Sequence, residues 1–338
     1  MQITPGKLSG LKAVSTETGT IGAAAMDQRG SLKKALAKES GGEVSDAMME
    51  EFKGAVTEVL TPYASAVLLD PQWGIGPSKK RSDNAGLLLA YEESGYDNTR
   101  PGRLPDLLPQ WSVRRLKEAG ANCVKVLLYY TPHDTAVVNE EKHVFVERIG
   151  DECRANDIPF FLEFVAYDAN GGDEKGLEFA KIKPQVVSAS MAEFTKDRYS
   201  VDVMKVEVPV NMKFVAGAAS YVGEQAYTKA EALDHFRAAA AVATTPFIYL
   251  SAGVSNAEFT ESLELAAESG VTWAGVLCGR ATWKDGIPVY GKDGLEAFRR
   301  WLQDQGVENI GNVNERLKAA SPWFASYGVT SADALAAV

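Results

Sequence analysis

Eight short, mostly apolar segments recur along the 338 residues and alternate with longer segments of helical periodicity. A strand that is hydrophobic on both faces is typical of a parallel sheet buried between helices. Eight strands of this kind are the number that closes a (β/α)8 barrel, so the sequence predicts an α/β protein with a TIM barrel. The predicted strands are 21–27, 66–70, 86–92, 122–130, 159–167, 201–209, 246–253 and 273–279.

The segments between these strands decide between a barrel and an open sheet. An open doubly wound sheet is the alternative, but residues 26–34 (MDQRGSLKK) lack the G-x-G-x-x-G turn expected after its first strand. Residues 71–85 are predicted as a polar loop, and 291–338 as terminal helices that close the outside of a single domain, 1–338. The predicted helices are 45–60, 108–120, 144–157, 229–243 and 255–270.

Charge and apolar content restrict the partners. A formal net charge of −10 and a pI near 5.0 oppose attraction to nucleic acid or to an anionic membrane, so an anionic substrate needs a local basic pocket. The sequence has no run of 18 apolar residues, and its first ten residues do not resemble a signal peptide. We therefore expect a cytoplasmic protein that binds neither nucleic acid nor membrane.

The cysteines and histidines favour neither disulfides nor a metal centre. The three cysteines stand far apart without CxxC spacing, which is typical of buried free thiols. Of the three histidines, two lie in polar segments of helical pattern rather than at strand ends. We expect no metal site. The residues are Cys123, Cys153, Cys278, His133, His143 and His235.

A lysine interrupts the sixth apolar strand. Alternation along 201–209 places Lys205 on the opposite face from Met204 and Val206, so Lys205 points into the barrel if those two pack on helices. Burial disfavours the charged form of a lysine and frees its amine to attack a carbonyl, as Schiff-base chemistry requires. The alternative is a structural lysine neutralised by Glu163 or Glu207.

Similar polar residues interrupt or end other strands. Lys125 in the fourth strand would add a second ammonium, and Glu163 in the fifth could carry protons, or could simply neutralise a lysine. Asp27 and Gln28, after the first strand, are placed either to bind substrate hydroxyls or to act as loop residues. For Asp70, at the end of the second strand, a structural role is favoured.

The last two strands end in glycine-containing loops. Barrels often bind phosphate where the loops after strands seven and eight meet a helix N-terminus. Ser251 and Gly253 follow strand seven, and Gly279 and Arg280 follow strand eight. These residues predict a phosphate site; the alternative is ordinary turn glycines and a surface arginine.

The segments MDQRGSLKK, LLDPQWG, VKVLLYYTP, FFLEFVAYD, VDVMKVEVPVN, LSAGVSNAEF and GVLCGRATWKDG together resemble class I tagatose 1,6-bisphosphate aldolases over most of residues 15–290. The resemblance implies that Lys205 forms the imine and that Glu163 transfers protons. It also implies contacts to substrate oxygens from Asp27, Gln28 and Lys125, and contacts to phosphate from Ser251, Gly253 and Arg280.

The resemblance implies an activity as well. Such enzymes cleave tagatose 1,6-bisphosphate to dihydroxyacetone phosphate and glyceraldehyde 3-phosphate in lactose and galactose catabolism, and they tend to form homo-oligomers. We expect no cofactor, because the protonated imine itself accepts the electrons. The alternatives are fructose 1,6-bisphosphate or sulfofructose 1-phosphate as substrate, a phosphosugar isomerase, or a catalytically silent regulator that binds a sugar phosphate.

Overall fold

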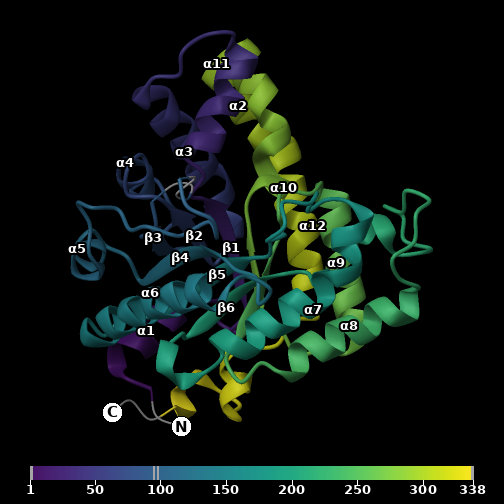
Figure 1. Ribbon diagram of the computed structural model, residues 1–338. Helices are drawn as coiled ribbons and strands as arrows, with labels where there is room; N and C mark the ends of the chain where they lie inside the picture. Colours follow the sequence, from purple (N-terminus) through teal and green to yellow (C-terminus); the bar gives the residue numbers. More distant parts are fainter. Residues whose placement is uncertain (1–2, 94–95, 97–98, 336–338) are drawn as a thin grey trace.

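The computed structural model describes residues 3–93, 96 and 99–335. Eight parallel strands pair in sequence order, and the last pairs with the first, which closes a barrel (Figure 1). The predicted TIM barrel is confirmed, and each predicted strand contains an observed one. The strands are β1 (Ile21–Met26), β2 (Ala66–Leu69), β3 (Gly86–Ala90), β4 (Cys123–Tyr129), β5 (Phe160–Val165), β6 (Val203–Glu207), β7 (Phe247–Leu250) and β8 (Gly275–Cys278).

Helices surround the barrel (Figure 1). Short segments include the π-helical turn η5 (Leu302–Gly306) and the 3-10 helix η6 (Trp323–Tyr327). The α-helices are α1 (Pro5–Ala13), α2 (Gly30–Ser40), α3 (Asp46–Leu60), α4 (Ile75–Ser78), α5 (Val113–Glu118), α6 (Ala136–Ala155), α7 (Leu177–Phe194), α8 (Lys229–Ala241), α9 (Asn256–Ser269), α10 (Arg280–Trp283), α11 (Ile287–Trp301) and α12 (Val307–Leu317).

The helix predictions need four corrections. Helix α6 begins at Ala136, eight residues before the predicted start, because the hydroxyl of Thr135 accepts the Val138 N–H and caps the helix there. Helix α5 covers only six residues of the predicted 108–120. The predicted loop 71–85 contains one helical turn, α4. The sequence prediction omitted α1, α2 and α7; α7 contains Pro184, which is disfavoured inside a helix.

The strand alternation divides the apolar residues into two layers. Side chains on the outer faces of the strands pack against the surrounding helices. Inward-facing side chains near the strand starts fill the lower barrel together with α1 and the fully buried Trp323 of η6. The floor of the barrel is therefore apolar, and polar side chains occur above it, toward the strand ends.

The C-terminal helices pack on the outside of the barrel, as predicted from 291 onward. Helix α11 lies along α2 and α3, and α12 packs on α9 (Figure 1). Gly294, with φ of 78°, interrupts α11 with a kink. Residues 336–338 of the predicted terminal segment lie outside the described residues. Within the described part of the chain, no helix is both long and apolar enough to cross a membrane.

Candidate active site

The predicted inward-facing residues do face the interior of the barrel. Met204 and Val206 pack in the outer layer against the helices, so Lys205 between them points inward. The same alternation directs Lys125 and Glu163 inward from β4 and β5. Glu163 and Lys205 are register partners in the β5–β6 pairing, so their side chains emerge side by side at one level.

Glu163 bridges the two lysines. Its Oε1 lies 2.8 Å from the Lys205 Nζ, and its Oε2 lies 2.8 Å from the Lys125 Nζ. Lys125 also contacts Asp27 at 2.8 Å and Glu92 at 2.9 Å, so three carboxylates surround its ammonium. Both lysine side chains are almost fully buried. Low exposure strengthens these interactions relative to water.

The network shifts the pKa values of its members. Burial alone would raise the pKa of the Asp27 carboxyl, but Lys125 and Lys205 hold it well below its usual range. For Glu163, burial likewise opposes ionisation, and the same two ammonium groups lower its pKa. Burial would lower the pKa of Lys125, but the carboxylates of Asp27, Glu163 and Glu92 raise it well above its usual value. Lys125 is therefore a fixed cation at neutral pH.

A second group of predicted residues follows β7 and β8. Gly253 has φ of 79°, and a Cβ there would lie 2.6 Å from the Arg280 Cζ, so only glycine lets the guanidinium pack against this loop. A Cβ on Gly279 would lie 2.9 Å from the Ala25 carbonyl oxygen, which brings this loop close to the end of β1. Ser251 is buried, and Arg280 is exposed.

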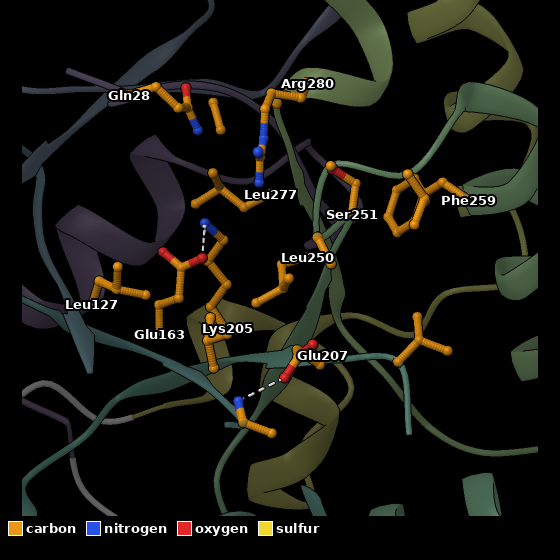
Figure 2. Close-up of a pocket in the computed structure, with 18 of the residues that line it drawn as sticks. Gln28, Leu127, Glu163, Lys205, Glu207, Leu250, Ser251, Phe259, Leu277 and Arg280 are labelled. Carbon is orange, nitrogen blue, oxygen red and sulfur yellow. Dashed lines mark hydrogen bonds and ion pairs between the residues drawn. The ribbon is translucent and has the colours of Figure 1, made fainter. Parts of the chain in front are cut away.

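One cavity of about 980 Å³ joins the two groups. In Figure 2, the Glu163 carboxylate lies on one side of the Lys205 amine, and the Arg280 guanidinium and Ser251 lie on the other. Glu207, the other proposed neutraliser of Lys205, instead pairs with Lys183 at 3.3 Å. All nine predicted site residues line the cavity: Asp27, Gln28, Lys125, Glu163, Lys205, Ser251, Gly253, Gly279 and Arg280.

Two further cavity residues escaped the sequence analysis. Glu92, just after β3, contacts Lys125, and its Oε2 accepts the Leu127 N–H at 3.1 Å. Arg29 is buried, and its Nη2 donates to the Glu92 carbonyl at 2.6 Å. Glu92 ends the predicted strand 86–92, so the rule that found Glu163 and Lys205 could also have found it. Arg29 lies within the MDQRG motif but had no spacing signal of its own.

Several buried polar atoms at the cavity have no hydrogen-bond partner among the described residues. Asp27 Oδ1, Gln28 Oε1, Arg29 Nε and Arg29 Nη1 have no hydrogen-bond partner among the described residues, and all three side chains line the cavity. Buried polar groups are rarely left unpaired unless a ligand or water completes them. The cavity thus offers donors and acceptors for hydroxyl groups beside a buried lysine and its carboxylate, with an arginine on the far side for an anionic group.

Comparison with known proteins gives this architecture a family context. The family description "DeoC/LacD family aldolase" matches residues 21–285. The chain is 52% identical over 329 residues to a "Tagatose 1,6-diphosphate aldolase" of Listeria monocytogenes, with 97% of this chain and 96% of that protein covered. It is also 52% identical to "Tagatose 1,6-diphosphate aldolase 2" of Enterococcus faecalis, over 97% of this chain and 99% of the relative.

Solved structures share the fold. A fructose-bisphosphate aldolase from Plasmodium falciparum superposes with a TM-score of 0.61 at 14% identity, covering 97% of both chains. A Schiff-base-forming fructose-1,6-bisphosphate aldolase gives a TM-score of 0.53 at 14% identity, covering 87% of this chain and 97% of that one. At such low identity the superpositions support the barrel fold alone.

Proposed function

Because this chain belongs to the DeoC/LacD family of aldolases, we propose that it is a class I aldolase that cleaves D-tagatose 1,6-bisphosphate to dihydroxyacetone phosphate and D-glyceraldehyde 3-phosphate. The observation that carries the proposal is the buried Lys205, whose amine lies 2.8 Å from the Glu163 carboxylate at the centre of the cavity. A nucleophilic amine beside a proton acceptor is the arrangement that imine formation requires.

The first half of the reaction forms the imine. Lys205 transfers a proton to Glu163 and, as the neutral amine, attacks C2 of the open-chain ketose; the carbonyl oxygen then takes a proton from the attacking nitrogen and becomes a hydroxyl. Protonated Glu163 returns its proton to that hydroxyl, and water leaves. The product is an iminium between C2 and Lys205, with Glu163 again a carboxylate. The lowered pKa of Glu163 keeps it a carboxylate in the resting state, so that it is free to accept a proton.

The second half breaks the carbon–carbon bond. Glu163 accepts the proton of the C4 hydroxyl, the C3–C4 electron pair moves into the iminium, and glyceraldehyde 3-phosphate leaves. The remaining enamine is protonated at C3 and hydrolysed to dihydroxyacetone phosphate, which restores Lys205. Lys125, held cationic by its carboxylates, binds substrate oxygens together with Asp27 and Gln28.

The β7 and β8 loops hold the C1 phosphate in this proposal. Gly253 brings the loop backbone and the Arg280 guanidinium into contact, and Ser251 and Gly279 complete the pocket wall. Backbone N–H groups and a guanidinium fork are suited to phosphate oxygens. Arg280 and Ser251 lie across the Lys205 amine from Glu163 (Figure 2), which supports a binding mode in which a phosphate held by them directs the substrate ketone toward Lys205.

Borohydride trapping tests the mechanism. The chain is treated with sodium borohydride in the presence of dihydroxyacetone phosphate, and intact-mass spectrometry with peptide mapping locates the reduced adduct. We expect one stable adduct on Lys205, and none on Lys125 or in a Lys205→Met chain. Absence of any adduct under turnover conditions contradicts the proposal and favours a phosphosugar isomerase or a binding protein.

Substrate identity is tested separately. Values of kcat/KM are measured for tagatose 1,6-bisphosphate, fructose 1,6-bisphosphate and sulfofructose 1-phosphate. A preference for tagatose 1,6-bisphosphate supports the proposal, and a preference for either other ketose contradicts its substrate assignment alone.

We also propose a cytoplasmic location, which the three free, buried cysteines support. A homo-oligomer, proposed from the family resemblance, is tested by light scattering.

A further inference from the structure

A fully buried lysine outside the cavity donates hydrogen bonds to the backbone at the end of β1. Lys53 lies on α3, and its side chain has no exposed surface. Its Nζ donates to the carbonyl oxygens of Met26 at 2.7 Å and Gln28 at 2.8 Å, and it pairs with Asp70. A buried ammonium whose three donors all meet oxygen acceptors is fully satisfied. The helix is thereby tied to the backbone that follows β1.

The two carbonyls that Lys53 holds belong to the residues on either side of Asp27. Asp27 uses Oδ2 to contact Lys125 at 2.8 Å, and its Oδ1 has no partner among the described residues. The preceding carbonyl, that of Ala25, accepts the Trp283 Nε1–H at 2.9 Å. Without these donors the turn carrying Asp27 and Gln28 would lose most of its side-chain supports.

Asp70 links this anchor to the next strand. Its Oδ1 accepts the backbone N–H groups of Gln72 at 3.0 Å and Trp73 at 2.9 Å, which fixes the turn after β2. Lys53 therefore lies between two strand ends, with the fixed β2 turn on one side and the Asp27 turn on the other. An apolar side chain of similar length could fill the same space without desolvating a charge, so packing alone does not explain a lysine here.

We propose that Lys53 is a positioning residue for aldol cleavage: by holding the Met26 and Gln28 carbonyls, it aims Asp27 and Gln28 at the substrate hydroxyls. This inference rests on the function proposed above, in which Asp27 and Gln28 contact substrate. Lys53 itself does not line the cavity and touches no reacting atom. Its loss misplaces groups that act on the reacting carbons and leaves the β7 and β8 phosphate loops intact.

A matched ion pair at the opposite end of the barrel supplies the control. Lys7 of α1 pairs with Asp202 at 2.9 Å, just before β6, and Asp202 accepts the Phe160 N–H. Both pairs tie a helix to the sheet, although the side chains of Lys7 and Asp202 are 12% and 10% exposed and those of Lys53 and Asp70 are fully buried. Replacing Lys7 and Asp202 by Met and Asn removes an ion pair between a helix and the sheet at the strand starts, where neither residue lines the cavity.

The experiment compares Lys53→Met/Asp70→Asn with Lys7→Met/Asp202→Asn; each double change removes both charges, so no unpaired charge remains. For the first we expect kcat to fall by about 10- to 100-fold with KM within about 3-fold, because small misplacement of polar groups costs this much. For the second we expect both constants within about 2-fold of the parent. Equal kcat in the parent and the Lys53 double variant overturns the proposal.

A mutant cycle separates positioning from general destabilisation. In an Asp27→Ala/Gln28→Ala background, the Lys53 double change should cost less than about 3-fold further in kcat, because both side chains that it positions are already absent. A loss as large as in the parent background overturns the proposal. Should the double variant not fold, Lys53→Gln, which keeps a neutral donor, should lower kcat by about 3- to 10-fold; parental kcat in that variant is the contradicting result.

Borohydride trapping distinguishes this inference from the proposed function. The Lys53 variants should still form the adduct on Lys205, because the amine and Glu163 are unchanged. A parent chain without adduct would refute the aldolase mechanism itself. A parent chain with adduct, combined with fully active Lys53 variants, would refute only the positioning role.

Discussion

The two sides of the cavity are built differently. On the β4 to β6 side, Lys125, Lys205 and Glu163 are buried and already paired with one another. On the β7 and β8 side, the backbone curves through the positive φ of Gly253, and the exposed Arg280 forms no ion pair with the described residues. The first side is organised before substrate arrives, and the second is open to an anion. We therefore expect mutations on the first side to change mainly kcat, and mutations on the second side to change mainly KM.

On the β4 to β6 side of the cavity, the two strand lysines also differ from each other. Lys125 contacts three carboxylates, from Asp27, Glu92 and Glu163, whereas Lys205 contacts Glu163. The carboxylates raise the pKa of Lys125 well above its usual value and hold it as a cation. We therefore expect the two lysines to have different tasks, with Lys125 as a fixed cation and Lys205 as the amine that reacts.

The largest effect should follow from Lys205→Met. Loss of the nucleophile should reduce kcat by on the order of 10⁴-fold or more. Glu163 keeps its contact with Lys125, so the fold should persist. Steady-state kinetics and a thermal melt measure the two properties. Substantial residual turnover in a folded Lys205→Met chain would remove Lys205 from the mechanism.

Lys125→Met should lower kcat by about 10²- to 10³-fold while Lys205 still forms a borohydride adduct. It should also lower the free energy of unfolding by about 3–5 kcal/mol, because three buried carboxylates lose their common cation. Urea unfolding of this variant and of Lys205→Met measures the contrast. Equal destabilisation by the two changes would contradict the assigned difference between the lysines.

Arg280→Ala tests the β7 and β8 side of the cavity. We expect KM for a phosphorylated ketose to rise by about 10- to 100-fold with kcat within about 3-fold, because charge-assisted hydrogen bonds to phosphate are lost far from the bond that breaks. Steady-state kinetics on the proposed bisphosphate provide both constants. An unchanged KM, or a loss confined to kcat, would show that the arginine does not hold the phosphate.

The pH at which the chain unfolds in acid should depend on the carboxylates that pair with the buried lysines. The pKa values of Asp27 and Glu163 are lowered in the folded chain from about 3.8 and 4.5. Such groups contribute stability that is present above the unfolded pKa and lost as the pH falls through the folded one. Lys125→Met raises both folded values, so acid unfolding followed by circular dichroism should shift upward by on the order of half to one pH unit. Arg280→Ala should leave the midpoint unchanged.

Sequence reasoning predicted the features that hydrophobic periodicity determines, which are the number of strands and the face on which each side chain lies. Alternation in 201–209 and 122–130 placed Lys205 and Lys125 inside the barrel, and the strand count predicted its closure. The role of Lys53 depends on the distance between α3 and the end of β1, which no local pattern encodes. The same holds for the number of carboxylates around Lys125, because its partners come from three other strand ends. Local patterns therefore predicted the nine site residues and offered the Lys205–Glu163 contact as an alternative, but they missed Glu92 and the other partners of Lys125.

The smallest effect should come from Gly253→Ala, which tests whether backbone geometry on the open side matters apart from charge. The new Cβ would lie 2.6 Å from the Arg280 Cζ, and φ of 79° is strained for alanine. The guanidinium should move aside, which should raise KM by about 3- to 10-fold with little change in kcat. Gly217, also at positive φ but with open space around its Cβ position, is the matched control: Gly217→Ala should share the backbone strain without the change in KM. Equal KM values in the two variants would assign the phosphate site to the arginine alone, independent of the loop that packs against it.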